Sequence, residues 1–131
     1  QRAEHANRFI DLTDRYDVND LLFVSSVLIT DYSSVVYEAS ILNLPMLFYA
    51  FDLESYCKER DFYCDYASFV PGRIVRTMEE LVHALQTEDY QQEKVAPFYT
   101  RNFDDTAGKA TQNVVHFAKE LLHIPTDHLP L

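Results

Sequence analysis

The sequence predicts an α/β fold in which helices flank an open, doubly wound parallel sheet. Four short apolar segments alternate along the chain with longer segments whose apolar residues recur at helical spacing. This alternation is typical of βαβ units, whose strands are parallel and are covered by helices on both faces. The length of 131 residues corresponds to one domain, which is large enough to bury a core without disulfides or metal ions.

The four strand candidates are residues 9–12, 26–30, 46–49 and 73–76. The second candidate is short, apolar and rich in β-branched side chains, which suits a strand buried on both faces. Pro45 stops the preceding helix and opens the third candidate. The pair Pro71–Gly72 is a turn signal directly before the fourth. Ligands of such sheets bind beyond the carboxyl ends of the strands, at strand-to-helix turns.

Each of the first four predicted helices follows a residue that is able to cap it. These helices begin after Asp17, after residues 31–34 with an end near Asn43, after Asp52 with an end near Arg60, and after Thr77. The last of them has the spacing of a capping box, in which the Thr77 hydroxyl and the Glu80 carboxylate satisfy free amides at the helix start.

The C-terminal third is predicted to be helical. Residues 90–100 are predicted as a helix broken around Pro97, because an interior proline removes a helical hydrogen bond. Thr106 to about His123 is predicted as the last helix, with an apolar stripe along one side. Residues 124–131 contain two prolines and are predicted as a tail, so the predicted domain is residues 1–123.

The net charge of −10 argues against nucleic acid as a partner, since such binding depends on phosphate neutralisation by Lys and Arg. It also disfavours electrostatic docking to anionic lipid, and no segment has the ~20 apolar residues that span a bilayer. Cys57 and Cys64 lack zinc spacing and are read as reduced thiols, with a disulfide as the alternative. The two glycines, Gly72 and Gly108, form no glycine-rich phosphate loop.

The segment from Thr30 to Glu38 is the strongest candidate site. It places Asp31, Ser33 and Ser34 between a predicted strand and a predicted helix. Hydroxyls and free backbone amides at a helix N-terminus suit an anion, and a diphosphate would fit there. The alternative is ordinary helix capping by the same residues. Glu38 lies one turn further and either faces the same crevice, where it would accept hydrogen bonds from ribose hydroxyls, or is a solvated side chain.

The same segment resembles the CDP-glycerol glycerophosphotransferase family, the teichoic acid polymerases and primases. The similar residues are 18–22, 28–39, 44–49, 52–53, Tyr56, Arg60, 62–63, 65–66, Pro71–Gly72 and 108–110. The run Thr-Asp-Tyr-Ser-Ser at 30–34, followed by the acidic Glu38, is the most specific part. The resemblance implies a GT-B glycosyltransferase architecture, of which this chain would be part of the Rossmann-like C-terminal, donor-binding half, incomplete at its N-terminal side.

The activity implied by the resemblance is transfer of glycerol phosphate from CDP-glycerol to a teichoic-acid-type acceptor, with release of CMP. Thr30, Ser33 and Ser34 would bind the donor diphosphate, Asp31 would be a further donor-binding residue, and Glu38 would lie near the ribose of the donor. Arg101 would stabilise phosphate charge as the phosphoanhydride breaks, and Lys109 would contact phosphate or lie exposed at the start of the last helix. The general base is expected outside this chain, with His5 only a minor candidate for a donor contact.

The resemblance also implies the partners. We expect a nucleotide-activated donor, an N-terminal acceptor domain of the same protein, and membrane contact only through the rest of that protein, at the cytoplasmic face. A second copy of the chain is a further candidate partner. No cofactor and no metal site are expected, and Asp104 and Asp105 are read as helix-start charges. The aromatic segment 62–69 either stacks on the cytosine ring or packs over the sheet edge.

Two other readings remain open. The same site would suit another donor, such as CDP-ribitol or a nucleotide-sugar, because CDP-glycerol and CDP-ribitol carry the same nucleotide. Alternatively, the chain is a non-catalytic α/β interaction module resembling a response regulator. Such a receiver needs an acidic pair after its first strand, and none follows residues 9–12. Alone, the chain is expected to be catalytically silent.

Overall fold

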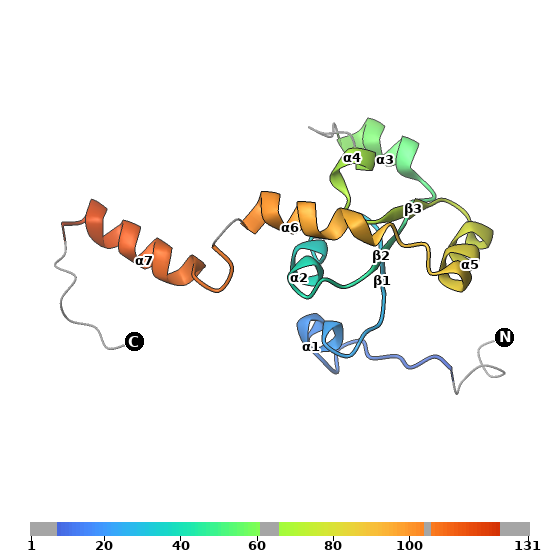
Figure 1. Ribbon diagram of the computed structural model, residues 1–131, viewed down its shortest axis with the longest axis horizontal. Coiled ribbons are helices and arrows are strands. Elements are labelled where there is room, and N and C mark those ends of the chain that lie inside the picture. Colours follow the sequence, from blue (N-terminus) through green and yellow to red (C-terminus); the bar gives the residue numbers. More distant parts are fainter. Residues whose placement is uncertain (1–7, 61–65, 104–105, 124–131) are drawn as a thin grey trace.

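The computed structural model describes residues 8–60, 66–103 and 106–123 (Figure 1). Its elements, in chain order, are α1 (Val18–Leu22), β1 (Leu28–Thr30), α2 (Val36–Ile41), β2 (Met46–Tyr49), α3 (Leu53–Arg60), α4 (Tyr66–Phe69), β3 (Arg73–Val75), α5 (Met78–Thr87), the 3-10 helix η1 (Gln92–Lys94), α6 (Val95–Phe103) and α7 (Ala110–Leu121). The three strands form one parallel sheet in the order β1-β2-β3. The predicted fold class and the strand predictions at 26–30, 46–49 and 73–76 are therefore confirmed.

The central strand β2 supplies side chains to two separate cores. Met46 and Phe48 lie in the larger core with buried residues of α2, α4 and α6. Leu47 points to the opposite face, where it packs with Val75 and with Leu81 and Ala84 of α5. Figure 1 shows α5 on one side of the strands and α2 on the other. This alternation follows from the two-residue period of a strand, and it explains why β2 is apolar at every position.

Strand β1 lies at one edge of the sheet, and only one of its faces is well covered. Leu28 packs against the larger core, whereas the next residue, Ile29, is 44% exposed. Ile29 is paired with Leu47, but the helix α5 covers Leu47 and Val75 rather than β1. The prediction that this strand is buried on both faces is therefore wrong for the described residues, because its second face has no covering helix.

The predicted strand at 9–12 is not present: residues 9–12 are irregular, and a turn follows at 13–15. Phe9 and Ile10 are each 77% exposed, so no neighbouring strand shields them. Asp11 then accepts a hydrogen bond from the amide of Thr13 at 3.0 Å, and its hydrogen bonds with Thr13 lower the pKa of this carboxyl. An aspartate that bonds an amide two residues ahead starts a turn and prevents strand extension.

The predicted break around Pro97 is also wrong. Helix α6 is continuous from Val95 to Phe103, and the discontinuity comes earlier, where η1 passes into α6. Pro97 is the third residue of α6. Amides of the first helical turn have no partner within the helix, so a proline there removes no hydrogen bond.

The side-chain caps predicted for the helices after Asp17 and after Thr77 are confirmed. The Asp17 carboxylate accepts a hydrogen bond from the amide of Asn19 at 2.8 Å, directly before α1. The Thr77 hydroxyl accepts from the amide of Glu80 at 3.2 Å, directly before α5. The Glu80 carboxylate returns a bond to the amide of Arg76 at 2.7 Å, one residue before the position that the capping box predicts.

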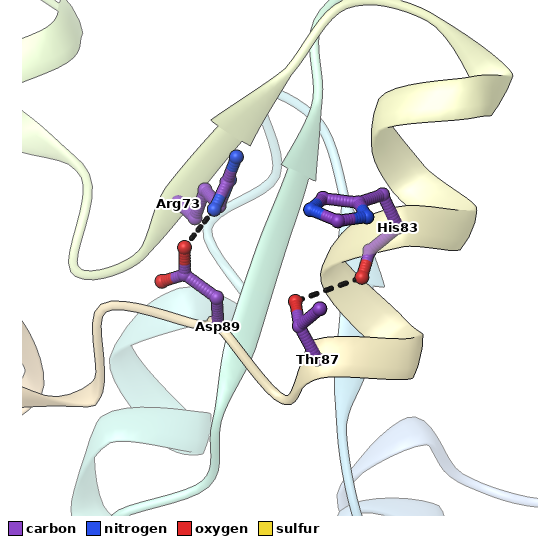
Figure 2. A network of polar contacts seen from close by, with 4 residues as sticks. All are labelled: Arg73, His83, Thr87 and Asp89. Atoms are coloured by element: carbon purple, nitrogen blue, oxygen red, sulfur yellow. Dashed lines mark hydrogen bonds and ion pairs between the residues drawn. The ribbon is translucent and has the colours of Figure 1, made fainter.

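Polar contacts fix the amino end of β3. Arg73 forms an ion pair with Asp89, and its amide donates to the carbonyl of Tyr90 at 3.0 Å (Figure 2). Nearby in α5, the Thr87 hydroxyl donates to the carbonyl of His83 at 2.8 Å. The two contacts of Arg73 attach the segment after α5 to the start of β3, at the end of the strand opposite to its carboxyl end.

Helix α7 has the predicted apolar stripe, but none of its residues is buried. The exposed apolar side chains are Val114, Val115, Phe117 and Leu121, with Leu122 directly after the helix. Figure 1 shows α7 beyond the end of α6 and away from the sheet. The helix spans Ala110–Leu121, slightly shorter than the predicted range of 106–123.

Candidate functional site

The carboxyl ends of the three strands form one edge of the sheet, because the strands are parallel. Thr30 ends β1, and Asp31, Ser33 and Ser34 follow it in the turn that leads to α2. Asp31 and both serines are exposed, and Thr30 is half-buried. The structure thus places these four predicted site residues together at the edge where ligands of parallel sheets bind.

The predicted capping of α2 by residues 31–34 is wrong. Val35 occupies the N-cap position, and no side chain forms a cap hydrogen bond there. The amide of Tyr37 already donates to the carbonyl of Ser34 at 3.1 Å, so a backbone turn leads into the helix. The Ser33 hydroxyl instead accepts from the amide of Val35 at 3.4 Å, which closes a local turn.

Two tyrosines connect the turn after β1 to its surroundings. Tyr66 of α4 donates its hydroxyl hydrogen to the carbonyl oxygen of Asp31 at 2.9 Å. Tyr32, within the turn, donates to the carboxylate of Asp52 at 2.9 Å and stacks on the ring of Tyr56 with a centroid separation of 3.6 Å. The turn is therefore held by side chains of α4, of α3 and of the segment after β2.

Arg101 lies in the last turn of α6, beside α4. Its guanidinium donates to the carbonyl of Phe69 at 3.4 Å and lies 5.9 Å and 5.6 Å from the ring centroids of Phe69 and Phe98. The ring of Tyr37, in α2, contacts Phe69 and Phe98 as well. Arg101 is exposed and borders a cavity of about 350 Å³ that also includes Lys94. Two cations thus border a cavity in a chain of strongly negative charge.

Glu38 and Lys109, the other two residues predicted to contact the donor, lie in different helical regions of the chain. Glu38 is exposed in the first turn of α2. Lys109 is exposed directly before α7, which Figure 1 shows away from the sheet. Among the described residues, the structure therefore brings Glu38 near the turn after β1 and leaves Lys109 apart from it.

A second cavity, of about 300 Å³, lies at the carboxyl ends of β2 and β3. Residues 50–55 and Arg76 line it. Sequence reasoning missed Arg76, although it is the last residue of the predicted strand 73–76, at the strand end where ligands of parallel sheets bind. It also missed Tyr32 and Asp52 as partners, because their contact joins residues far apart in the chain.

Some predicted residues lie outside the described ranges, namely His5, Phe62, Tyr63, Cys64, Asp104, Asp105 and His128. Cys57 lies in α3. His83 and His116 are exposed, and His116 lies 3.2 Å from the carboxylate of Glu120. Within the described ranges, no three His, Cys, Asp or Glu side chains gather as a metal site requires.

Comparison with known proteins identifies the family. The profile of the CDP-Glycerol:Poly(glycerophosphate) glycerophosphotransferase family matches residues 1–119. The chain belongs to this family. The resemblance of the Thr30–Glu38 segment is thereby confirmed, and the family membership extends across all of the strands and nearly all of the helices described above.

Individual members of the glycerophosphotransferase family are similar to the chain over most of its length. The teichoic acid ribitol-phosphate polymerase TarK of Staphylococcus aureus (strain NCTC 8325 / PS 47) is 49% identical over 112 residues, which are 86% of this chain and 22% of TarK. The teichoic acid glycerol-phosphate primase of Bacillus subtilis (strain 168) is 36% identical over 119 residues, which are 91% of this chain and 31% of the primase.

The solved structure of the wall teichoic acid polymerase TagF has the same fold in this region. It is 32% identical to the chain, with a TM-score of 0.71 over 98% of this chain and 33% of TagF. TagF is a GT-B glycosyltransferase, as the sequence predicts. The chain therefore spans about a fifth to a third of the length of these relatives. None of the helices in the described ranges is long and apolar enough to cross a bilayer.

Proposed function

We propose that this chain binds the nucleotide donor of a glycerophosphotransferase, which transfers glycerol phosphate from CDP-glycerol to a teichoic-acid-type acceptor and releases CMP. One observation carries the proposal. In a chain whose family match covers residues 1–119, the Thr-Asp-Tyr-Ser-Ser segment lies at the carboxyl end of β1 with both serines exposed. This is the edge at which parallel α/β sheets bind their ligands.

The diphosphate lies at the turn after β1 in this proposal. The hydroxyls of Thr30, Ser33 and Ser34 donate to its oxygens, and backbone amides of the turn contribute further donors. The Tyr66 hydroxyl fixes the turn by its bond to the Asp31 carbonyl, so the donors are held in place before the ligand arrives. The Asp31 carboxylate must then point away from the phosphates, because like charges repel.

Arg101 stabilises negative charge on the phosphates in the proposed reaction. An acceptor hydroxyl attacks the β-phosphorus of CDP-glycerol and forms a new oxygen–phosphorus bond. The bond between the β-phosphorus and the bridging oxygen breaks, and CMP leaves with the electron pair. The hydroxyl proton passes to a general base outside this chain. A guanidinium beside the leaving phosphate lowers the energy of the developing charge, and a planar fork suits phosphate oxygens.

CDP-ribitol is a second candidate donor, and one observation favours it. The ribitol-phosphate polymerase TarK is more similar to this chain, at 49% identity, than the glycerol-phosphate primase, at 36%. Both donors carry the same cytidine diphosphate, so the site after β1 would serve either. We therefore propose the donor class as a CDP-activated polyol and leave the choice of polyol to a direct competition between the two.

The remainder of the proposal concerns the rest of a longer protein. An acceptor-binding domain would supply the acceptor and the base, and it would also make any membrane contact at the cytoplasmic face. The proposal includes no metal ion and no other cofactor, and the phosphates are contacted by hydroxyls, amides and Arg101. The chain alone would bind donor without turnover.

The test is an amide NMR titration of this chain with CDP-glycerol and CDP-ribitol, with CMP and AMP as references. Saturable shifts at residues 30–36 and at Arg101 with the cytidine ligands alone would support the proposal.

The double variant Ser33→Ala/Ser34→Ala should bind the donor at least tenfold more weakly, because each lost hydrogen bond to a charged group contributes about 1.5–3 kcal/mol. Ser26→Ala, an exposed serine before β1, is the matched control. Equal affinity in the double variant and the control would contradict the proposed site.

A further inference from the structure

We infer that the cavity lined by residues 50–55 and Arg76 binds a hydroxyl-bearing part of the donor, either the ribose or the polyol. The inference rests on the proposed function. That proposal places the donor diphosphate at the turn after β1, and the inference places a hydroxyl-bearing part of the same donor in the cavity beside that turn. The cavity has a volume of about 300 Å³. That volume accommodates a ribose or a small polyol.

The position of the cavity makes it a neighbour of the proposed diphosphate site. Residues 50–55 follow β2, which pairs directly with β1, and Arg76 follows β3, which pairs with β2. The Tyr32 hydroxyl, in the turn after β1, donates to the carboxylate of Asp52, which lines the cavity. A ligand whose diphosphate lies at the turn therefore has this cavity beside it.

The charges that line the cavity favour a neutral, hydroxyl-rich group over a second phosphate. The carboxylates of Asp52 and Glu54 oppose the single guanidinium of Arg76, so the lining carries a net negative charge. Carboxylates accept hydrogen bonds and a guanidinium only donates them. A sugar or polyol hydroxyl does both, so vicinal hydroxyls satisfy the two kinds of group together. A phosphate would be repelled by two carboxylates.

The side chain of Arg76 is available for such a ligand. Its Nη1 atom lies 3.8 Å from the Glu54 carboxylate, which is too long for a hydrogen bond, and the two side chains are 56% and 81% exposed. An exposed pair at this distance contributes little to stability. The backbone of Arg76 is fixed, since its amide donates to the Glu80 carboxylate at 2.7 Å. The guanidinium of Arg76 can therefore turn toward a ligand while the backbone of Arg76 stays in place.

The test measures dissociation constants for the wild-type chain, for Arg76→Gln and for Glu54→Gln. The ligands are CDP-glycerol, CDP-ribitol, CMP and 2′-deoxy-CMP. We expect both substitutions to weaken binding of the CDP-polyols by roughly tenfold, the loss of about one charge-assisted hydrogen bond. Arg15→Gln is the matched control, because Arg15 is exposed and lies outside the sheet. Urea unfolding of each variant checks that the fold is retained.

The ligand series separates the two sources of hydroxyls. If the cavity binds ribose, the variants lose affinity for CMP as well, and 2′-deoxy-CMP binds the wild type more weakly than CMP. If it binds the polyol, CMP affinity is unchanged and the loss is confined to the CDP-polyols. Either result supports the inference.

Two results would overturn it, and they are distinguishable. Donor binding that Ser33→Ala/Ser34→Ala weakens, but that Arg76→Gln and Glu54→Gln leave unchanged, overturns the cavity assignment and leaves the proposed function standing. Absence of any cytidine-ligand binding by the wild-type chain overturns both.

Discussion

The hydroxyl of Tyr66 donates a 2.9 Å hydrogen bond to the backbone carbonyl of Asp31, 35 residues earlier in the chain. The Tyr66 side chain is buried, and its ring also contacts Tyr32 and Phe48. One side chain therefore connects the core under α4 with the turn after β1. The conformation of the proposed diphosphate site depends on a residue that follows β2 in the sequence.

Tyr66→Phe should lower both stability and donor affinity. The phenylalanine ring keeps the contacts with Tyr32 and Phe48, but the Asp31 carbonyl loses a partner, which costs about 1 kcal/mol of unfolding free energy. The turn then samples more conformations, so the donor binds more weakly. Urea unfolding and the donor titration measure the two effects. Tyr16→Phe, at a tyrosine that is 62% exposed, is the control and should change neither.

Gly72→Ala should destabilise the fold. A Cβ atom at this position would lie 2.3 Å from the Met46 carbonyl oxygen and 3.0 Å from the ring of Phe48, so β2 and β3 must separate locally. Overpacking of this kind costs about 1–3 kcal/mol. Gly108→Ala separates steric overlap from backbone strain, because nothing lies within 4 Å of the added atom but the φ of 73° costs alanine about 1–2 kcal/mol. Chemical denaturation should show the larger loss for Gly72→Ala, and an equal loss would contradict the steric explanation.

Thr77→Ala should destabilise the chain through α5. The substitution removes the bond that the Thr77 hydroxyl accepts from the Glu80 amide, and loss of an N-cap side chain typically costs about 1 kcal/mol. Thr77→Ser should restore most of that stability, since serine caps equally well. Thr111→Ala, at an exposed threonine within α7, serves as the comparison in thermal unfolding. A Thr77→Ser variant as unstable as Thr77→Ala would show that the methyl group, not the hydroxyl, matters.

Arg101→Lys should reduce donor affinity with little change in stability. Arg101 is exposed, so its contribution to folding is small. Its planar group faces the rings of Phe69 and Phe98 and is thereby oriented, which an ammonium cannot reproduce. We expect roughly tenfold weaker donor binding, as for one lost bidentate phosphate contact. Lys119→Gln on α7 removes a charge elsewhere and should bind the donor normally.

The parts of the fold that local patterns determine were predictable from the sequence. The strands at 26–30, 46–49 and 73–76 are short, mainly apolar runs between helical segments, a pattern that favours strands of a parallel sheet, and Asp17 and Thr77 cap the helices that they precede. The prediction of a strand at 9–12 was wrong, because a local apolar run does not determine whether a strand finds a neighbour to pair with. Its apolar residues resemble a strand locally, but a strand needs a partner, and Phe9 and Ile10 remain exposed.

The candidate site was predictable only in part, for a similar reason. A strand followed by Asp31, Ser33 and Ser34 is a local pattern, and the structure places those residues at a strand end. The contacts of Arg101 with Phe69 and of Tyr32 with Asp52 depend on how α6 and α3 pack, and no spacing in the sequence encodes them. Arg76 was accessible to sequence reasoning, because it ends the predicted strand 73–76.

The central strand β2 should also dominate the hydrogen-exchange behaviour of the chain. Leu47 and Phe48 are fully buried on opposite faces, and β2 pairs with a strand on each side, so their amides reach solvent only when the sheet itself opens. Their exchange will report global unfolding, whereas the amides of α7, which has no buried residue, will exchange through local fraying. The two cores consequently open as one cooperative unit, and the slowest-exchanging amides will lie together on β2.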